Sequence, residues 1–163
     1  MIKEKELREI RPQIRYQHGG DISLETVRDS LSDCASQTGI SISFYTDQIK
    51  FGGLIGGSLE NCLVLYHPEH ENDYFKMAIR VTHQNSYVFV NVYGFGTSRL
   101  MDNVASHEIT MEALKHGSGT QKVGAVIGAG LRRMVKGGRN SQKLEEEQNW
   151  YAMVSDLFDE FLS

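Results

Sequence analysis

The strongest pattern in this chain is an alternation of apolar and polar residues over 73–96. Two runs rich in β-branched and aromatic residues flank a polar stretch at 83–86, so the pattern predicts a β-hairpin over residues 74–94. A loop centred on the polar stretch pairs Ile79 with Val90 and leaves one face of the hairpin wholly apolar. We expect this face, which also carries Met77, Val81, Val88 and Val92, to lie on the hydrophobic core.

The opposite face of the predicted hairpin combines aromatic and basic side chains. It carries Lys76, Arg80, Tyr87, Phe89 and Tyr93. Aromatic rings stack on nucleobases and cations contact phosphates, so this composition is typical of a sheet that binds single-stranded nucleic acid, and Arg132 and Arg133 would extend it. Two other interpretations are cation–π pairs across the strands and burial under C-terminal helices. Burial is the expectation, because the predicted C-terminal helices need a surface to cover.

The elements before this hairpin are less regular. Residues 1–20 predict a short helix to about Glu9 followed by an extended arm, although the alternation over residues 10–16 also fits an edge strand. Ser23 is a typical N-cap for a helix with an apolar stripe from Leu24 to Ala35, which Gly39 should end.

Three further strand segments follow that helix. The pattern predicts a strand over 40–45, a turn at 46–48 with a return through residues 49–51, and a short strand over 62–66. Between them, residues 52–58 place Leu54 and Ile55 between glycine pairs. This segment fits a hinge, a bulged edge strand or a loop that another backbone approaches closely.

Beyond Gly96 the apolar period changes to that of a helix. We expect helices capped by Thr97 or Ser98, by Thr120 and by Ser141, the last with Trp150 on its apolar side. The fold class is therefore α+β, with an antiparallel sheet of about five strands, a meander around the hairpin, preceded by one helix and followed by about three. We expect a single domain over 1–163, made of an N-terminal arm (1–20), a helix plus sheet (21–96) and C-terminal helices (97–163).

Composition agrees with an ordinary globular protein. The chain has 163 residues, of which 40% are hydrophobic and 23% charged, so it can bury a sizeable core. Two widely spaced cysteines, Cys34 and Cys62, indicate a reducing compartment, and the charged N-terminus does not have the pattern of a signal peptide. The longest apolar run, 123–131, is too short to span a bilayer. We therefore expect a cytoplasmic protein without a membrane partner.

Charge is segregated along the C-terminal part. The chain carries a net charge of −4, yet every charged residue over 115–143 is basic and every one after 143 is acidic. Such blocks indicate neighbouring helices that attract or two docking faces, and solvated helix faces are the simplest interpretation.

The loop over 67–73 concentrates side chains that bind metals. His67, His70 and Asp73 could hold zinc or manganese if another segment supplied a further ligand, although polar loops between strands often have this composition. The pair His107-Glu108 lacks the second histidine of a zinc-protease motif, because Met111 stands there. No cofactor is expected.

One predicted helix has a face of small residues. Gly124 and Gly128 lie one turn apart, and each glycine costs about 1 kcal/mol of helix propensity. Close packing within the fold would offset this cost, and a homodimer is the alternative, with Trp150, Leu157 and Phe161 as further interface residues.

These patterns contain no coherent catalytic set, so no catalytic residue is assigned. The leading hypothesis is a non-enzymatic cytoplasmic protein that binds other macromolecules, as a homo-oligomer and with an unidentified protein partner. The alternatives are a single-stranded nucleic-acid binder that uses the sheet face and a metal-dependent enzyme that uses the 67–73 loop.

Overall fold

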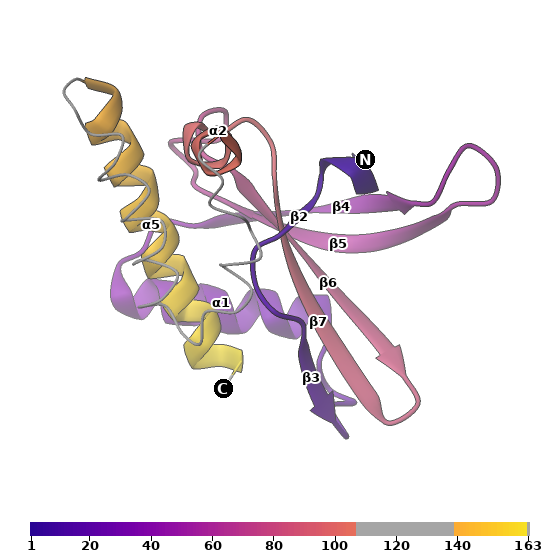
Figure 1. Cartoon of the computed structure of the whole chain (residues 1–163). Coiled ribbons are helices and arrows are strands. Elements are labelled where there is room, and N and C mark those ends of the chain that lie inside the picture. The colour runs from indigo at the N-terminus through magenta and orange to yellow at the C-terminus, as the bar shows by residue number, and fades with distance from the viewer. Residues whose placement is uncertain (107–138, 163) are drawn as a thin grey trace.

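A computed structural model describes residues 1–106 and 139–162 of the chain (Figure 1). Within them the chain forms one seven-stranded sheet and three α-helices. The strands are β1 (Ile2–Lys3), β2 (Arg8–Glu9), β3 (Ile14–Gln17), β4 (Ser43–Phe51), β5 (Ser58–Tyr66), β6 (Lys76–Gln84) and β7 (Tyr87–Phe95). The helices are α1 (Leu24–Thr38), α2 (Arg99–Ser106) and α5 (Arg139–Leu162).

The sheet is mixed rather than purely antiparallel. Its strand order is β1-β4-β5-β6-β7-β2, and β3 also pairs with β7. Strand β1 runs parallel to β4, whereas the other pairings are antiparallel. The α+β class is confirmed. The additional strands come from the N-terminal segment, which supplies a short strand to one edge and two to the other.

The predicted N-terminal helix is wrong. Only Glu4–Glu6 form a short 3₁₀ helix, and the residues around them extend along the sheet. Ile2 lies opposite Ile49 of β4, and Ile14 lies opposite Val90 of β7. Pairing with strands far away in the sequence overrides the weak helical spacing, as the alternation over residues 10–16 allowed.

Strand β4 continues through the segment predicted as a turn. Thr46, Asp47 and Gln48 lie opposite Leu63, Cys62 and Asn61 of β5, so the two strands pair along their full length of nine residues. The chain reverses at residues 52–57, which we call the glycine tip. The glycines of this tip, two of which adopt positive φ angles, form the turn instead of Thr46–Gln48. The polar residues 46–48 therefore stay within the strand.

The central hairpin forms, with a register that differs from the prediction by two residues. Ile79 lies opposite Val92 rather than Val90. The cause is a tighter turn: only Asn85 and Ser86 lie between the strands, and Asn85 adopts a φ of 56°. Asparagine tolerates this left-handed conformation better than most residues. Because the shift is even, each side chain keeps its predicted face.

Helix α1 matches its prediction. Ser23 is the N-cap, and its side chain accepts a hydrogen bond from the Thr26 N–H at 3.2 Å. Gly39 ends the helix at a φ of 71°. Val27, Leu31 and Ala35 are buried, so the predicted stripe faces the core.

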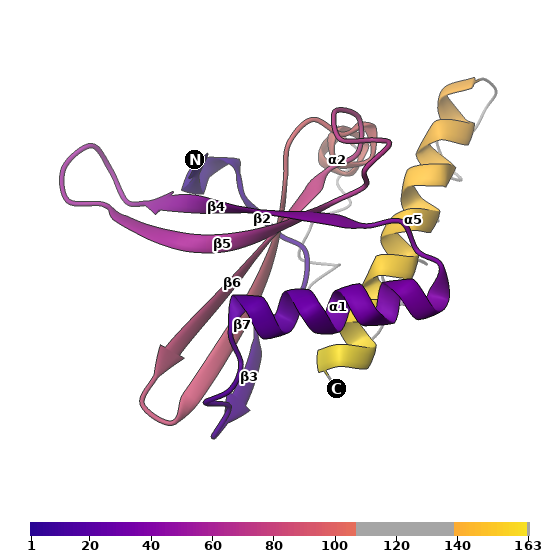
Figure 2. The ribbon, with the colours of Figure 1, turned by 180° about the vertical axis from the view of Figure 1, so that it is seen from behind.

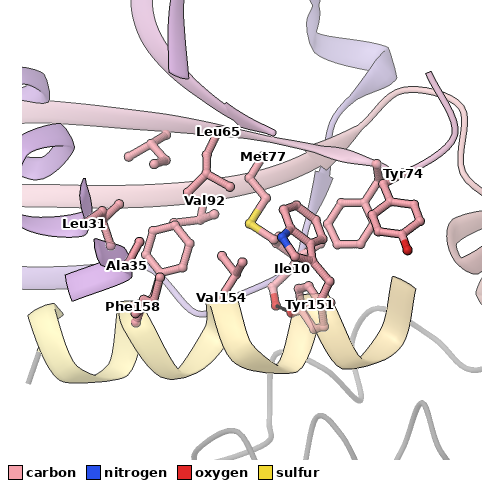
Figure 3. Packing of buried hydrophobic residues seen from close by; sticks show 14 of the residues in the cluster. Ile10, Leu31, Ala35, Leu65, Tyr74, Met77, Val92, Tyr151, Val154 and Phe158 are labelled. Atoms are coloured by element: carbon pink, nitrogen blue, oxygen red, sulfur yellow. Dashed lines mark hydrogen bonds between the residues drawn. The ribbon is translucent and has the colours of Figure 1, made fainter. Parts of the chain in front are cut away.

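The main core lies between the apolar face of the sheet and helices α1 and α5 (Figure 3). One cluster contains Met77 and Val92 of the central hairpin, Leu31 of α1, and Val154 and Phe158 of α5. The C-terminal helix thus covers the valine face. Helix α5 therefore does not cover the aromatic and basic face, whereas the other C-terminal segment that was expected to cover it, 107–138, lies outside the described residues.

The two long hairpins separate from one another. Strands β5 and β6 pair only over Leu63–Leu65 and Met77–Ile79, whereas the two strands within each hairpin pair over nine residues. Beyond this short ladder the hairpins diverge, and the β4–β5 hairpin projects away from the helices in both views (Figures 1 and 2).

Of the predicted C-terminal helices, two are described in part or in full. Ser98 caps α2, because its hydroxyl accepts a hydrogen bond from the Met101 N–H at 3.2 Å. Helix α5 begins at Arg139, two residues before the predicted cap at Ser141. The predicted helix over 120–136, with Gly124 and Gly128, lies outside the described residues.

Candidate functional site

The most exposed apolar side chains lie on the glycine tip. Leu54 and Ile55 are 102% and 97% exposed. Of the five large apolar residues that are exposed in the described part of the chain, Met1 and Leu59 also belong to this end of the molecule, and only Met153, on α5, lies elsewhere. The exposed apolar residues are thus concentrated at the end of the β4–β5 hairpin.

The backbone of the tip depends on its glycines. Gly52 and Gly56 both have a φ of 87°, a conformation that other residues rarely adopt. A methyl group at Gly57 would collide with the carbonyl oxygen of Phe51. The close approach is that of the hairpin's own two strands, because Phe51 is the last residue of β4 and Gly57 directly precedes β5. The same geometry presents the two aliphatic side chains outward.

A second, smaller core supports the projecting hairpin on the sheet face opposite α5. Its buried members are Ile2, Ile49, Cys62, Val64 and Ala78. Burial raises the pKa of the Cys62 thiol to about 11, so this cysteine stays protonated at neutral pH. Partly buried side chains of Leu7, Tyr45, Phe51, Tyr93 and Phe95 surround these residues.

The N-terminal segment attaches to the hairpin by polar contacts as well. The terminal ammonium group lies 2.9 Å from the Asp47 carboxylate, and the Gly52 N–H donates to Glu4 Oε2 at 3.0 Å. Burial acts to raise the pKa of Asp47, but the hydrogen bond and charge of the ammonium group and the Gln48 N–H outweigh it, so the pKa is lowered. Strand β1 and the tip consequently form one surface.

An open hollow of about 410 Å³ lies on this surface, between the N-terminal segment and the tip. Met1 and Leu54 supply apolar walls, and three lysines, one glutamate and the tip glycines complete it; the full lining is Met1, Lys3, Glu4, Lys5, Lys50, Gly52, Gly53 and Leu54. Within the described residues, the ammonium groups of Lys3, Lys5 and Lys50 form no ion pair. The hollow is thus lined by lysines and aliphatic groups.

Lys76 and Arg80, the cations of the predicted nucleic-acid face that lie within the described residues, are paired with carboxylates. Arg80 Nε donates to Glu60 on β5, and its guanidinium lies 4.7 Å from the Phe51 ring centroid. Burial acts to lower the Arg80 pKa, but Glu60 outweighs it and the pKa is raised, so the group stays charged. Lys76 Nζ lies 3.3 Å from Glu71 and over the rings of Tyr45 and Tyr66. The cation–π interpretation of this face is confirmed.

The aromatic residues of that face are divided between two environments. Tyr93 is half-buried beside Arg80, and burial raises the pKa of its hydroxyl. Tyr87 and Phe89 lie further along β7 with ring centroids 6.3 Å apart, and Arg15 of β3 lies over Tyr87. Arg132 and Arg133 lie outside the described residues.

The loop between the two hairpins brings His67, His70 and Asp73 together. His70 Nδ1 lies 3.1 Å from an Asp73 carboxylate oxygen, and its ring stacks on Tyr74 at 4.1 Å between centroids. His67 Nδ1 accepts the Glu69 N–H at 3.1 Å. Burial lowers the pKa of His67, and the nearby His70 lowers it further.

These contacts give the loop a packing role. His67 and Tyr74 both contact the Trp150 ring, whose Nε1 donates to the Ser41 carbonyl oxygen at 3.0 Å. Across the described ranges, no group of three or more histidine, cysteine, aspartate or glutamate side chains has the geometry of a metal site. The metal hypothesis therefore gains no support from the described loop.

The predicted interface residues on α5 face inward. Trp150 and Leu157 are buried in the main core, and Phe161 is partly buried against it. They hold α5 on the sheet in the single chain. Gly124 and Gly128, the other predicted interface residues, lie outside the described residues.

A buried carboxylate that the sequence interpretation missed joins α5 to the sheet. Glu147 is 1% exposed, and it accepts hydrogen bonds from the Ser98 hydroxyl and from the N–H groups of Phe75, at 3.1 Å, and Leu100, at 3.3 Å. Burial raises the pKa of Glu147 although these donors act to lower it. Its spacing from Trp150 and Val154 places it on the apolar stripe of α5, which was the available signal.

No helix in the described ranges is both long and apolar enough to cross a bilayer. Comparisons with protein-family models, curated proteins and solved structures give no match for this chain.

Proposed function

We propose that the protein binds a macromolecule or a lipid assembly through the glycine tip and that this binding, rather than catalysis, is its function. The observation that carries the proposal is the full exposure of Leu54 and Ile55 at the end of a projecting hairpin. Large apolar side chains in this position contribute nothing to either core. If they were covered by a partner, each would contribute about 1.5 to 3 kcal/mol of binding free energy.

The surroundings of the tip support the same proposal. Met1 and Leu59 are 64% and 56% exposed and extend the apolar surface toward the sheet. The small core and the contact between Glu4 and Gly52 hold the base of the tip in place, which lowers the entropy lost on binding. The tip thus has an apolar surface on an ordered support.

The experiment places a photo-activated crosslinking amino acid at position 54, and separately at position 85 in the turn of the other hairpin, in cells that express the full chain. We expect a covalent adduct of defined mass at position 54, whether the partner is a second copy, another protein or a lipid. Changing Ile55→Ser in the same chain should abolish that adduct, because it removes half of the apolar pair.

The turn at position 85 is the matched control, since it also ends a hairpin but carries polar residues. An adduct yield at position 54 no higher than that at position 85, or one that survives Ile55→Ser, contradicts the proposal. Circular dichroism of both labelled proteins checks that the fold is retained.

A further inference from the structure

We propose that the surface bound by the glycine tip is an anionic lipid bilayer. This inference rests on the proposed function and specifies its partner. The sequence-based expectation of no membrane partner concerned a segment that spans the bilayer, whereas a peripheral contact requires only side chains that enter the interfacial region. The tip, its glycines and its lysines together meet that requirement.

The first observation is the chemistry of the tip. Leu54 and Ile55 are aliphatic, adjacent and fully exposed, and the glycines on both sides add no polar side chain that would have to enter the membrane. Met1 and Leu59 provide apolar surface behind them. A lipid interface accepts such groups to a depth of about 5–10 Å.

The second observation is the charge behind the tip. Lys3, Lys5 and Lys50 line the hollow beside Leu54 and have no ion-pair partner among the described residues. Three carboxylates belong to the same end: Asp47 pairs with the terminal ammonium group, whereas Glu4 and Glu6 accept backbone N–H groups, from Gly52 and from Lys3 at 3.1 Å, and keep their negative charge. The three lysines outnumber these two remaining carboxylates, so an excess of positive charge is available to lipid phosphates and carboxylates.

The position of the hairpin separates these cations from the acidic part of the chain. A strand of nine residues spans roughly 30 Å, and the tip lies at the opposite end of the molecule from α5, which carries the C-terminal acidic residues (Figures 1 and 2). Charges separated by more than about 8 Å in physiological salt are largely screened. The net charge of −4 consequently does not prevent local attraction to an anionic surface.

The same composition is less suited to other partners. Protein interfaces are enriched in tryptophan, tyrosine and arginine and depleted in lysine, and the tip and its hollow contain none of the first three. A symmetric contact centred on the hollow would bring the lysines of two copies, Lys3, Lys5 and Lys50 of each, into one interface, where their like charges repel. Aliphatic side chains also lack the ring faces on which nucleobases stack.

The test measures sedimentation of the full chain with phosphatidylcholine vesicles and with vesicles that also contain phosphatidylserine. We expect binding to the anionic vesicles only, and added salt should weaken it. The double variant Leu54→Ser, Ile55→Ser should bind at least tenfold more weakly. Each change of Lys3, Lys5 or Lys50 to glutamine should weaken binding about fivefold. Met153→Ser, which removes the exposed apolar residue of α5, should leave binding unchanged.

A fluorescent variant reports insertion directly. The chain has one tryptophan, Trp150, which is buried in the main core. Leu54→Trp should show a blue-shifted emission when anionic vesicles are added, whereas Asn85→Trp should not.

Wild-type protein that stays in the supernatant, equal binding to neutral vesicles, or tip variants that bind as well as wild type would each overturn the inference. If vesicles fail while the crosslinker at position 54 yields a protein adduct, the proposed function stands and only the lipid partner is wrong.

Discussion

The two long hairpins of this sheet have strands of equal length, but their turns differ in chemical character. The β6–β7 hairpin closes through Asn85 and Ser86, a tight polar turn, whereas the β4–β5 hairpin closes through glycines that surround two exposed aliphatic residues. One hairpin has its apolar face under α1 and α5, and the other rests on the smaller N-terminal core. The same chain can therefore end a hairpin without exposing apolar groups, so the aliphatic tip is not required by the fold.

The largest change in stability should come from truncating a buried isoleucine, and the two hairpins should respond differently. Ile79→Ala in the main core should lower the global free energy of unfolding by about 2 to 5 kcal/mol. Ile49→Ala, equally buried but in the smaller core, should mainly increase local opening of the β4–β5 hairpin. Urea denaturation measures the first effect and native-state hydrogen exchange the second. Equal global losses would show that the hairpins unfold as one unit.

The second prediction concerns the hydrogen bonds that connect α5 to Phe75, just before β6, and to Leu100 of α2. Glu147→Ala should lower the free energy of unfolding by about 2 to 3 kcal/mol, because the buried N–H groups of Phe75 and Leu100 lose their acceptor. Glu146→Ala, at the neighbouring exposed position, is the control and should change stability by less than about 0.5 kcal/mol. Thermal and urea unfolding at neutral pH give both values. Equal losses of stability for Glu147→Ala and Glu146→Ala would show that the buried hydrogen bonds of Glu147 contribute no extra stability.

Glu147 also predicts a dependence on pH. Its pKa is raised in the folded protein, so the native state binds the proton more tightly than the unfolded chain does. Its contribution to stability is fully present below the ordinary value of 4.5 and is lost as the pH rises through the raised pKa. Glu147→Gln should flatten this decrease in unfolding free energy, and an unchanged slope would assign the decrease to other groups.

The glycine tip offers a matched pair of smaller changes. Gly57→Ala should destabilise the protein by about 1 to 3 kcal/mol, because its methyl group meets the Phe51 carbonyl oxygen. Gly53→Ala, where no atom lies within 4 Å, should be neutral or stabilise by up to about 1 kcal/mol. Melting temperatures compare the two variants. A tip that tolerates both changes equally would lack the close approach described above.

The smallest effect is expected at the contact between the hairpins. Arg80 on β6 and Glu60 on β5 form an ion pair beyond the end of the β5–β6 ladder. Their side chains are 23% and 30% exposed, so a double-mutant cycle with glutamine at both positions should give a coupling of about 1 kcal/mol or less. Additive losses would mean that the hairpins are held together by the ladder and core alone.

Sequence periodicity predicted the parts of the fold that depend on local pattern. The predictions of helix α1, with its caps Ser23 and Gly39, and of the valine face of the central hairpin were correct because each pattern repeats over many residues. The register was wrong because it depends on one residue, Asn85, that accepts a positive φ. The N-terminal strands were missed because β1 and β2 have two residues each and exist only through long-range pairing.

The candidate site was predictable in composition but not in position. Leu54 and Ile55 between glycine pairs were noticeable in the sequence, yet their exposure follows from the divergence of the two hairpins, which no local pattern encodes. The contacts that pair Lys76 and Arg80 with Glu71 and Glu60 depend equally on strand register. Long-range geometry therefore decided which of the noticed residues remained available to a partner.

The position of α5 in the chain has a consequence for synthesis on the ribosome. The valine face is complete once β7 has emerged, but its cover from α5 is translated later, after residue 138. At about 5–20 residues per second, the interval between Phe95 and Phe158 lasts roughly 3 to 13 s. During this time the part of the apolar face that α5 covers has no cover from α5, so a chain that stalls before α5 would be a substrate for chaperones or would aggregate.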